Sequence, residues 1–232
     1  MKHASPAAPE LRSHHGLSYA LFLPAGELDV GVVIMHGAGS AKESHFDFGR
    51  GCRDEGMAAL AYDARGHGRS EGVFGPGAID DALAMIELLR ERVPRIALRG
   101  SSMGGFTAIH AAARSPVAPS AVVAICPAPE DSLLRMLRSE EPLRFECDLP
   151  ATREWLESLD LYEAAAALGP ETALLLLHAR GDEQIPFTVS QDLLAAAREP
   201  KRLLLLPGGH HRSLQHDLEL QAASRGFIRK AK

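Results

Sequence analysis

Seven short apolar runs recur along the chain and predict the strands of a β-sheet. The run VGVVIM is continuous and β-branched instead of alternating, which is typical of a strand that is covered on both faces. The other runs share its apolar character. The seven lie at 17–23, 30–35, 58–62, 95–99, 121–126, 173–178 and 202–206.

Helical patterns lie between several of these runs. In residues 78–93 the apolar positions fall on one face, acidic residues occupy the first turn and arginines the last, so both ends complement the helix dipole. Residues 104–114 and 213–229 are further predicted helices. Strands that alternate with helices of this length predict right-handed βαβ units. The expected fold class is therefore α/β, with a mostly parallel central sheet and helices on both faces.

One segment, residues 127–171, interrupts the alternation. It carries eleven acidic residues and four arginines, a net charge of −7, and it holds the single tryptophan, Trp155. An insertion after a core strand that is helical and partly apolar predicts a short cap over a pocket. A solvated acidic connector is the alternative. We expect one domain, residues 1–232, with the cap inside it.

Composition narrows the choice of partner and compartment. A length of 232 residues suits a single domain, and a net charge of −5 argues against nucleic acid. The three cysteines, Cys52, Cys126 and Cys147, form no disulfide framework and suggest a reducing compartment. Residues 1–15 lack a secretory signal, and the longest apolar stretch, at 173–177, is too short to cross a bilayer. We expect a soluble, cytoplasmic protein with a loosely ordered beginning.

The pattern Gly-x-Ser-x-Gly occurs twice, and its surroundings distinguish the two copies. GRSEG, residues 68–72, has no apolar flank and reads as a loop. GSSMG, residues 100–104, follows a predicted strand and precedes a predicted helix. A nucleophilic serine of this type lies on a tight turn between a strand and a helix, at the sheet edge where ligands bind. Ser102 is therefore the candidate nucleophile.

A serine hydroxyl needs a base to take its proton and a carboxylate to orient that base. Asp182 follows the predicted strand at 173–178, and His210 and His211 follow the strand at 202–206. Either histidine can serve by position. The order Ser102, acid, histidine is the one associated with a nucleophilic serine in this architecture. The histidines lack the spacing of a zinc site, so no metal is expected.

The chain resembles the α/β-hydrolase superfamily, specifically its small bacterial serine hydrolases, the carboxylesterase, lysophospholipase-like and serine aminopeptidase-like branch. The resemblance runs from about residue 17 to residue 229. It rests on the segments VVIMHGAGS, AYDARGHGRSEG, GSSMGG, HARGDEQIP and LPGGHH.

The resemblance implies roles for further residues. The backbone N–H groups of Ala38 and Met103 would form the oxyanion hole. The loop around Ser70 would be structural. His211, three residues after a glycine, would be the base, with His210 as the alternative if the loop is one residue tighter.

The implied activity is hydrolysis of short or medium acyl esters through an acyl-enzyme, by a Ser102–His211–Asp182 triad without a cofactor. The partner would be a small-molecule ester. A thioesterase, a peptidase and a non-catalytic binding or signalling homologue are the alternatives. The residues carry no signal of oligomeric state. Six apolar residues of the cap are expected to line the pocket: Leu133, Leu134, Met136, Leu137, Phe145 and Trp155.

Overall fold

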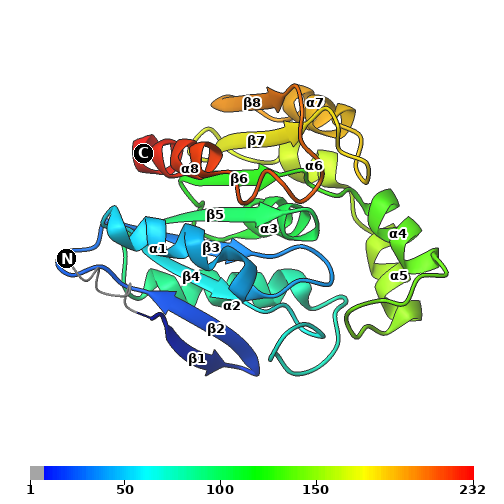
Figure 1. Cartoon of the computed structure of the whole chain (residues 1–232), viewed down its shortest axis with the longest axis horizontal. Coiled ribbons are helices and arrows are strands. Elements are labelled where there is room, and N and C mark those ends of the chain that lie inside the picture. Colours follow the sequence, from blue (N-terminus) through cyan, green and yellow to red (C-terminus); the bar gives the residue numbers. More distant parts are fainter. Residues whose placement is uncertain (1–7) are drawn as a thin grey trace, which may run out of the picture.

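The computed structural model describes residues 8–232 and contains an eight-stranded mixed sheet in the order β1-β2-β4-β3-β5-β6-β7-β8 (Figure 1). Strand β2 runs antiparallel to β1 and to β4, and all later neighbours are parallel. The strands are β1 (Glu10–His14), β2 (Leu17–Phe22), β3 (Val30–Met35), β4 (Ala58–Tyr62), β5 (Arg95–Ser101), β6 (Ala121–Ile125), β7 (Ala173–Ala179) and β8 (Lys201–Leu206).

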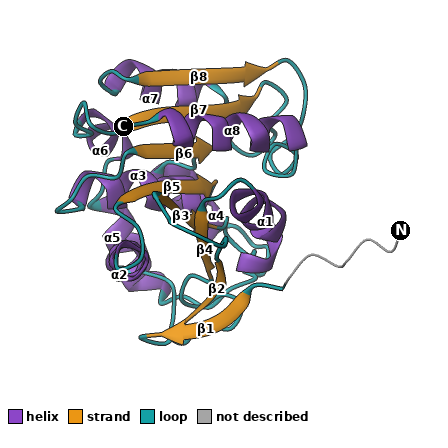
Figure 2. Cartoon of the chain, turned by 90° about the vertical axis from the view of Figure 1, so that its left-hand side faces the viewer, coloured by secondary structure: helices purple, strands orange, loops and turns teal. Residues whose placement is uncertain are grey.

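Helices cover both faces of this sheet (Figure 2). One apolar core contains Phe48 of α1 and Ile228 of α8, and the other contains side chains of α2, α3, α6 and α7. This arrangement is an α/β fold with a mostly parallel sheet, which confirms the predicted fold class. The helices are η1 (Lys42–His45), α1 (Phe46–Asp54), α2 (Ala78–Arg90), α3 (Met103–Arg114), α4 (Glu130–Arg138), α5 (Leu149–Glu157), α6 (Leu161–Ala166), α7 (Thr188–Ala196) and α8 (Leu218–Lys230).

The prediction was wrong at two places in the sequence. Residues 10–14, within the stretch expected to be loosely ordered, form β1 and pair with β2. This edge strand is largely exposed, so it lacks the apolar signal of the other strands. Residues 1–7 of that stretch lie outside the described residues. The helix predicted over 213–229 begins only at Leu218, because Asp217 caps it by accepting a hydrogen bond from the Leu220 N–H.

The segment 127–171 is helical, as predicted, but its three helices have different surroundings. Helices α4 and α5 lie together beyond the sheet, whereas α6 lies close to α3 and α7 (Figure 1). Trp155 of α5 makes edge-to-face contacts with Phe74 and Phe106, with ring centroids 5.7 and 5.9 Å away. The insertion is thus anchored on the core by aromatic packing. No helix within residues 8–232 is long and apolar enough to cross a membrane.

A buried ion pair joins the loop after β3 to the loop after β4. The Lys42 ammonium donates to the Asp63 carboxylate at 2.6 Å, and both side chains are almost completely excluded from solvent. The backbone N–H groups of Lys42 and Arg69 donate to the same carboxylate at 2.8 and 2.9 Å. Burial acts to raise the pKa of Asp63, but these hydrogen bonds outweigh it and lower that pKa. Asp63 therefore organises both loops as an anion.

The imidazole of His67 connects the same region to the inserted segment. Its ring stacks on Phe145 with centroids 4.5 Å apart, and its Nδ1–H donates to the Arg65 carbonyl at 3.0 Å. Its Nε2 is buried and has no hydrogen-bond partner among the described residues. Burial is the main cause that lowers the pKa of His67 to about 4, and the nearby His36 imidazole contributes to the same shift. The ring is consequently neutral in the folded protein at neutral pH.

Removing the Asp63 carboxylate should destabilise the fold, because Lys42 would remain a buried cation whose remaining ion pair is with the half-exposed Glu43 carboxylate, 3.2 Å away. We expect Asp63→Ala to lower the free energy of unfolding by about 3–5 kcal/mol. Glu157→Ala is the control, because Glu157 pairs with Arg138 at the surface and its loss should cost less than about 1 kcal/mol. Urea unfolding measures both. Equal, small losses in the two variants would contradict a structural role for the buried pair.

The neutral His67 predicts a loss of stability in acid. The unfolded chain takes up a proton at this histidine below about pH 6.5, whereas the folded chain does so only near pH 4. The stabilisation is complete above pH 6.5 and is lost as the pH falls toward 4. Between pH 7 and 4.5 the wild type should lose about 2–3 kcal/mol more than His67→Phe in urea unfolding. Parallel pH profiles of the two proteins would disprove this assignment.

Candidate active site

Ser102 lies in a strained turn between β5, which ends at Ser101, and α3, which begins at Met103. Its φ and ψ angles are 53° and −118°, a region that residues with a side chain rarely occupy. Neighbouring backbone holds this conformation. The Ser102 N–H donates to the Ile125 carbonyl at 2.8 Å, and the Ser102 carbonyl accepts from the Ala128 N–H at 3.2 Å.

Two glycines make this turn possible, because other chain segments approach their Cα atoms closely. A Cβ atom at Gly100 would lie 2.0 Å from the Gly104 carbonyl oxygen. A Cβ atom at Gly104 would lie 2.2 Å from the Met35 carbonyl oxygen, at the end of β3. Side chains cannot be accommodated at either distance. The glycines of GSSMG thus allow α3 to pack directly on the ends of β5 and β3, with Ser102 at the bend.

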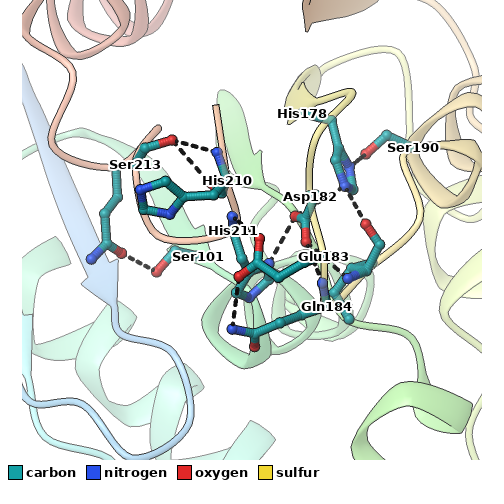
Figure 3. Close-up of polar contacts among 11 residues, drawn as sticks. Ser101, His178, Asp182, Glu183, Gln184, Ser190, His210, His211 and Ser213 are labelled. Carbon is teal, nitrogen blue, oxygen red and sulfur yellow. Dashed lines mark hydrogen bonds and ion pairs between the residues drawn. The ribbon is translucent and has the colours of Figure 1, made fainter. Parts of the chain in front are cut away.

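The loops after β7 and β8 bring Asp182 and His211 into contact (Figure 3). The His211 Nδ1–H donates to the Asp182 carboxylate at 2.8 Å. The other carboxylate oxygen accepts the backbone N–H groups of Gln184 and Ile185, both at 2.9 Å. The backbone N–H of His211 donates to the Glu183 carboxylate at 3.1 Å. Both the acid and the imidazole are therefore held in one orientation.

His211, and not His210, contacts the acid. The His210 side chain is exposed and its backbone N–H donates to the Ser213 hydroxyl at 2.9 Å (Figure 3). The hydroxyl in turn donates to the His210 carbonyl at 2.8 Å. His211 is only 8% exposed. This small turn points the two consecutive imidazoles in different directions. Position in the sequence alone does not tell which of the two contacts the acid.

Asp182 has two further partners that the sequence analysis did not single out. The buried His178 lies 3.3 Å from the Asp182 carboxylate, and its ring also bonds to Ser190 and to the Ile185 carbonyl at 2.7 and 3.0 Å. The Cys126 thiol donates to Asp182 as well. The only signal of these two residues in the sequence was their position, His178 at the end of β7 and Cys126 at the end of β6. Both strand ends lie at the edge of the sheet that also carries the predicted site.

The environment of Asp182 determines its charge. Burial acts to raise its pKa, but hydrogen bonds from His178, His211, Ile185 and Cys126 outweigh burial and hold the pKa well below its ordinary value. Asp182 is therefore an anion throughout the physiological range of pH. An anion at this position favours the Nδ1–H tautomer of His211, which leaves Nε2 free to accept a proton.

The loop that carries His211 is attached to the strand that carries Ser102. The Ser101 hydroxyl donates to the Gln215 side-chain oxygen at 2.8 Å, and the Arg99 guanidinium donates to the Gln215 carbonyl at 3.1 Å. Arg99 is 1% exposed and lies 4.0 Å from the ring centroid of Phe48. Burial lowers the pKa of Arg99 to about 10. Because this value is still well above neutral pH, the side chain stays charged. These bonds fix the distance between the two halves of the site.

The loop after β3, which carries Ala38, lies beside Ser102. A Cβ atom at Gly37 would lie 3.4 Å from the Ser102 Cβ atom. The His36 Nδ1–H donates to the Gly37 carbonyl at 2.8 Å, and Nε2 accepts the Ala64 N–H at 3.0 Å. His36 is therefore a neutral brace for this loop. Ala38 follows directly.

A cavity of about 760 Å³ opens beside these groups. Ser102, His211 and Ala38 line it, together with residues of α4 and of the loop that follows α4. Of the six apolar residues predicted to line it, Leu133, Met136 and Phe145 do so. The other three belong to the buried core instead and do not reach the cavity: Leu134, Leu137 and Trp155.

The second Gly-x-Ser-x-Gly copy is part of the scaffold. The Ser70 hydroxyl donates to the Asp63 carbonyl at 2.6 Å and accepts the Ser18 N–H at 2.9 Å. The first bond closes the loop after β4 on itself, and the second connects that loop to β2. Ser70 does not line the cavity that contains Ser102.

A metal ion has one conceivable position among the described residues. Cys126, Asp182 and His211 place possible ligand atoms within 4.8 Å of one another. Burial raises the pKa of the Cys126 thiol, whereas a metal ligand must be a thiolate. The Cys126 thiol and the His211 Nδ1–H also donate to the Asp182 carboxylate. These atoms fit a hydrogen-bonded set better than a metal site.

The fold resembles that of solved hydrolases. Est1E from Butyrivibrio proteoclasticus with bound ferulic acid is similar with a TM-score of 0.77, at 20% identity over 96% of this chain and 98% of that chain. A carboxyl esterase from Bacillus coagulans gives a TM-score of 0.77 at 13% identity, and the match covers 96% of this chain and 98% of the esterase. A monoacylglycerol lipase from Paleococcus ferrophilus gives a TM-score of 0.73 at 19% identity, and the match covers 93% of this chain and 99% of the lipase. These likenesses show the fold.

Curated relatives are similar in sequence but uncharacterised. YfhR of Escherichia coli K12 is 26% identical over 193 residues, which cover 81% of this chain and 65% of the relative. The protein MT2364 of Mycobacterium tuberculosis is 32% identical over 161 residues, which cover 67% of this chain and 53% of the relative. The chain thus spans just over half to about two thirds of the length of these relatives.

The family is shown by a direct match of its sequence model. Residues 26–141, half of the chain, match the family described as serine aminopeptidase, S33. The match covers the loop after β3, the turn at Ser102 and helix α4. With the fold described above, it places this chain in the S33 serine aminopeptidase family of the α/β-hydrolase superfamily.

Proposed function

We propose that this protein is a serine hydrolase that cleaves carboxylic esters through an acyl-enzyme. The observation that carries the proposal is the Asp182–His211 hydrogen bond at a cavity that His211 shares with Ser102, on its strained turn. Ser102 is the nucleophile, His211 the general base and Asp182 the orienting carboxylate. This is the constellation that a serine nucleophile requires.

The mechanism follows from these positions. His211 Nε2 takes the Ser102 proton as the Ser102 oxygen attacks the ester carbonyl, and Asp182 stabilises the imidazolium that forms. The N–H groups of Ala38 and Met103 stabilise the tetrahedral oxyanion, with each donor contributing about 3 kcal/mol. Met103 is the first residue of α3, so its N–H has no acceptor within the helix. His211 then protonates the leaving alkoxide, and water releases the acid by the reverse steps.

Several observations support an ester as the substrate. Est1E was solved with ferulic acid, and other structural neighbours are a lipase and a carboxyl esterase. The apolar part of the cavity lining, Leu133, Met136, Leu143 and Phe145, suits a short or medium acyl chain.

Peptide hydrolysis is the second candidate, because the matching family is described as serine aminopeptidase. An aminopeptidase must bind the ammonium group of its substrate, which requires acidic side chains near the scissile bond. Glu141 is the single carboxylate among the described residues that line the cavity, and three arginines line it too. The charge of the lining therefore favours an ester over a peptide with a free amino terminus.

Loss of Ser102 should abolish catalysis without loss of the fold. We expect Ser102→Ala to lower kcat/KM for 4-nitrophenyl esters at least about a thousandfold and to prevent labelling by a fluorophosphonate probe. Ser70→Ala is the matched control from the other Gly-x-Ser-x-Gly copy and should still be labelled at Ser102. Mass spectrometry locates the adduct. An adduct on Ser70, or full turnover by Ser102→Ala, would disprove the mechanism, and an unlabelled wild type would favour a non-catalytic homologue.

A further inference from the structure

Three arginines from separate segments converge on the cavity that contains Ser102 and His211. Arg135 belongs to α4, Arg144 to the loop between α4 and α5, and Arg212 to the loop after β8. One carboxylate, that of Glu141, lines the cavity with them, within the described residues. The inserted segment as a whole carries eleven acidic residues and four arginines. Ten of its eleven acidic residues thus do not line the cavity, whereas two of its four arginines do.

These arginines are poorly neutralised by the protein itself. In the part of the chain that the structure describes, Arg144 and Arg212 have no hydrogen bond or ion pair. Arg135 donates to the uncharged Ser132 hydroxyl at 2.8 Å. In contrast, Arg138 also belongs to α4 but lies outside the cavity, and it pairs with the Glu157 carboxylate at 3.4 Å. Three guanidinium groups therefore contribute positive charge to one concave surface.

Two of the three are attached directly beside the proposed catalytic groups. A Cβ atom at Gly39, the residue after Ala38, would lie 3.0 Å from the Arg144 Cβ atom. Arg212 is the residue after His211. A substrate whose carbonyl reaches Ser102 would therefore share the cavity with these two side chains and with the apolar residues of α4.

We propose that the preferred substrates are esters that carry an anionic group, such as a carboxylate, a few bonds from the scissile carbonyl. The planar guanidinium fork binds a carboxylate through paired hydrogen bonds, and a cleft lined by one sign of charge concentrates its counter-ion. The inference rests on the proposed ester hydrolysis and assigns its substrate class. The charge of this substrate class is opposite to the one that the acidic composition of the inserted segment suggests, which is a cationic substrate.

Matched ester pairs test the proposal. The first pair is the mono-4-nitrophenyl ester of adipic acid and 4-nitrophenyl hexanoate, which share the acyl length and differ in a terminal carboxylate. The second pair places the charge in the leaving group, as 4-(hexanoyloxy)benzoate against 4-(hexanoyloxy)benzamide. We expect kcat/KM to favour the anionic member of at least one pair about tenfold at low salt. The preference should decrease as ionic strength rises.

Arginine variants identify the origin of any preference. Arg144→Gln and Arg212→Gln should each reduce the anionic-to-neutral ratio several-fold, mainly through KM, and Arg135→Gln should reduce it less. Arg138→Gln is the matched control on α4 and should leave the ratio unchanged. Because each variant is judged by a ratio, a general loss of activity does not alter the result.

The outcomes separate this inference from the proposed function. A neutral ester that is hydrolysed as well as or better than its anionic counterpart in both pairs would overturn the anionic substrate class alone. A preference that survives replacement of all three arginines would also overturn it. No turnover of any ester, together with no fluorophosphonate adduct on Ser102, would instead overturn the proposed hydrolase activity.

Discussion

The close packing of α3 on the ends of β5 and β3 is the constraint on which the rest of the site depends. Backbone oxygens occupy the space where side chains at Gly100 and Gly104 would lie. The chain can therefore reverse from strand to helix within one residue, and Ser102 takes a conformation that is costly for a residue with a Cβ atom. The hydrogen bonds to β6 and to the loop after it maintain that conformation.

Around this turn, hydrogen bonds hold the polar groups that a serine nucleophile requires. Asp182 receives bonds from two imidazoles, a thiol and two backbone N–H groups, so it can remain charged although it is shielded from solvent. Arg99 and Ser101 bind Gln215 and thereby connect the strand that precedes Ser102 to the loop that carries His211. Groups that are fixed before the reaction need not reorganise during it, which is the basis of electrostatic catalysis.

The net charge of the inserted segment differs in sign from the charge that the segment presents to the cavity. The segment is strongly acidic, yet the charged side chains it contributes to the cavity are two arginines, Arg135 and Arg144, and one acid, Glu141. Which residues of a helix face a cavity depends on how the helix docks. Here Trp155 and the stacked pair of His67 and Phe145 anchor the segment on the core. The docking therefore decides which charges meet a substrate.

The sequence alone determined the fold class, seven of the eight strands and the candidates Ser102 and Asp182, because apolar periodicity and strand-end loops are local signals. Strand β1 was missed because an exposed edge strand needs no apolar pattern. Only the tertiary structure determines that His211, instead of His210, contacts Asp182, and that His178 contacts it as well. These contacts join residues from different strand ends, and their geometry depends on how the loops pack in space.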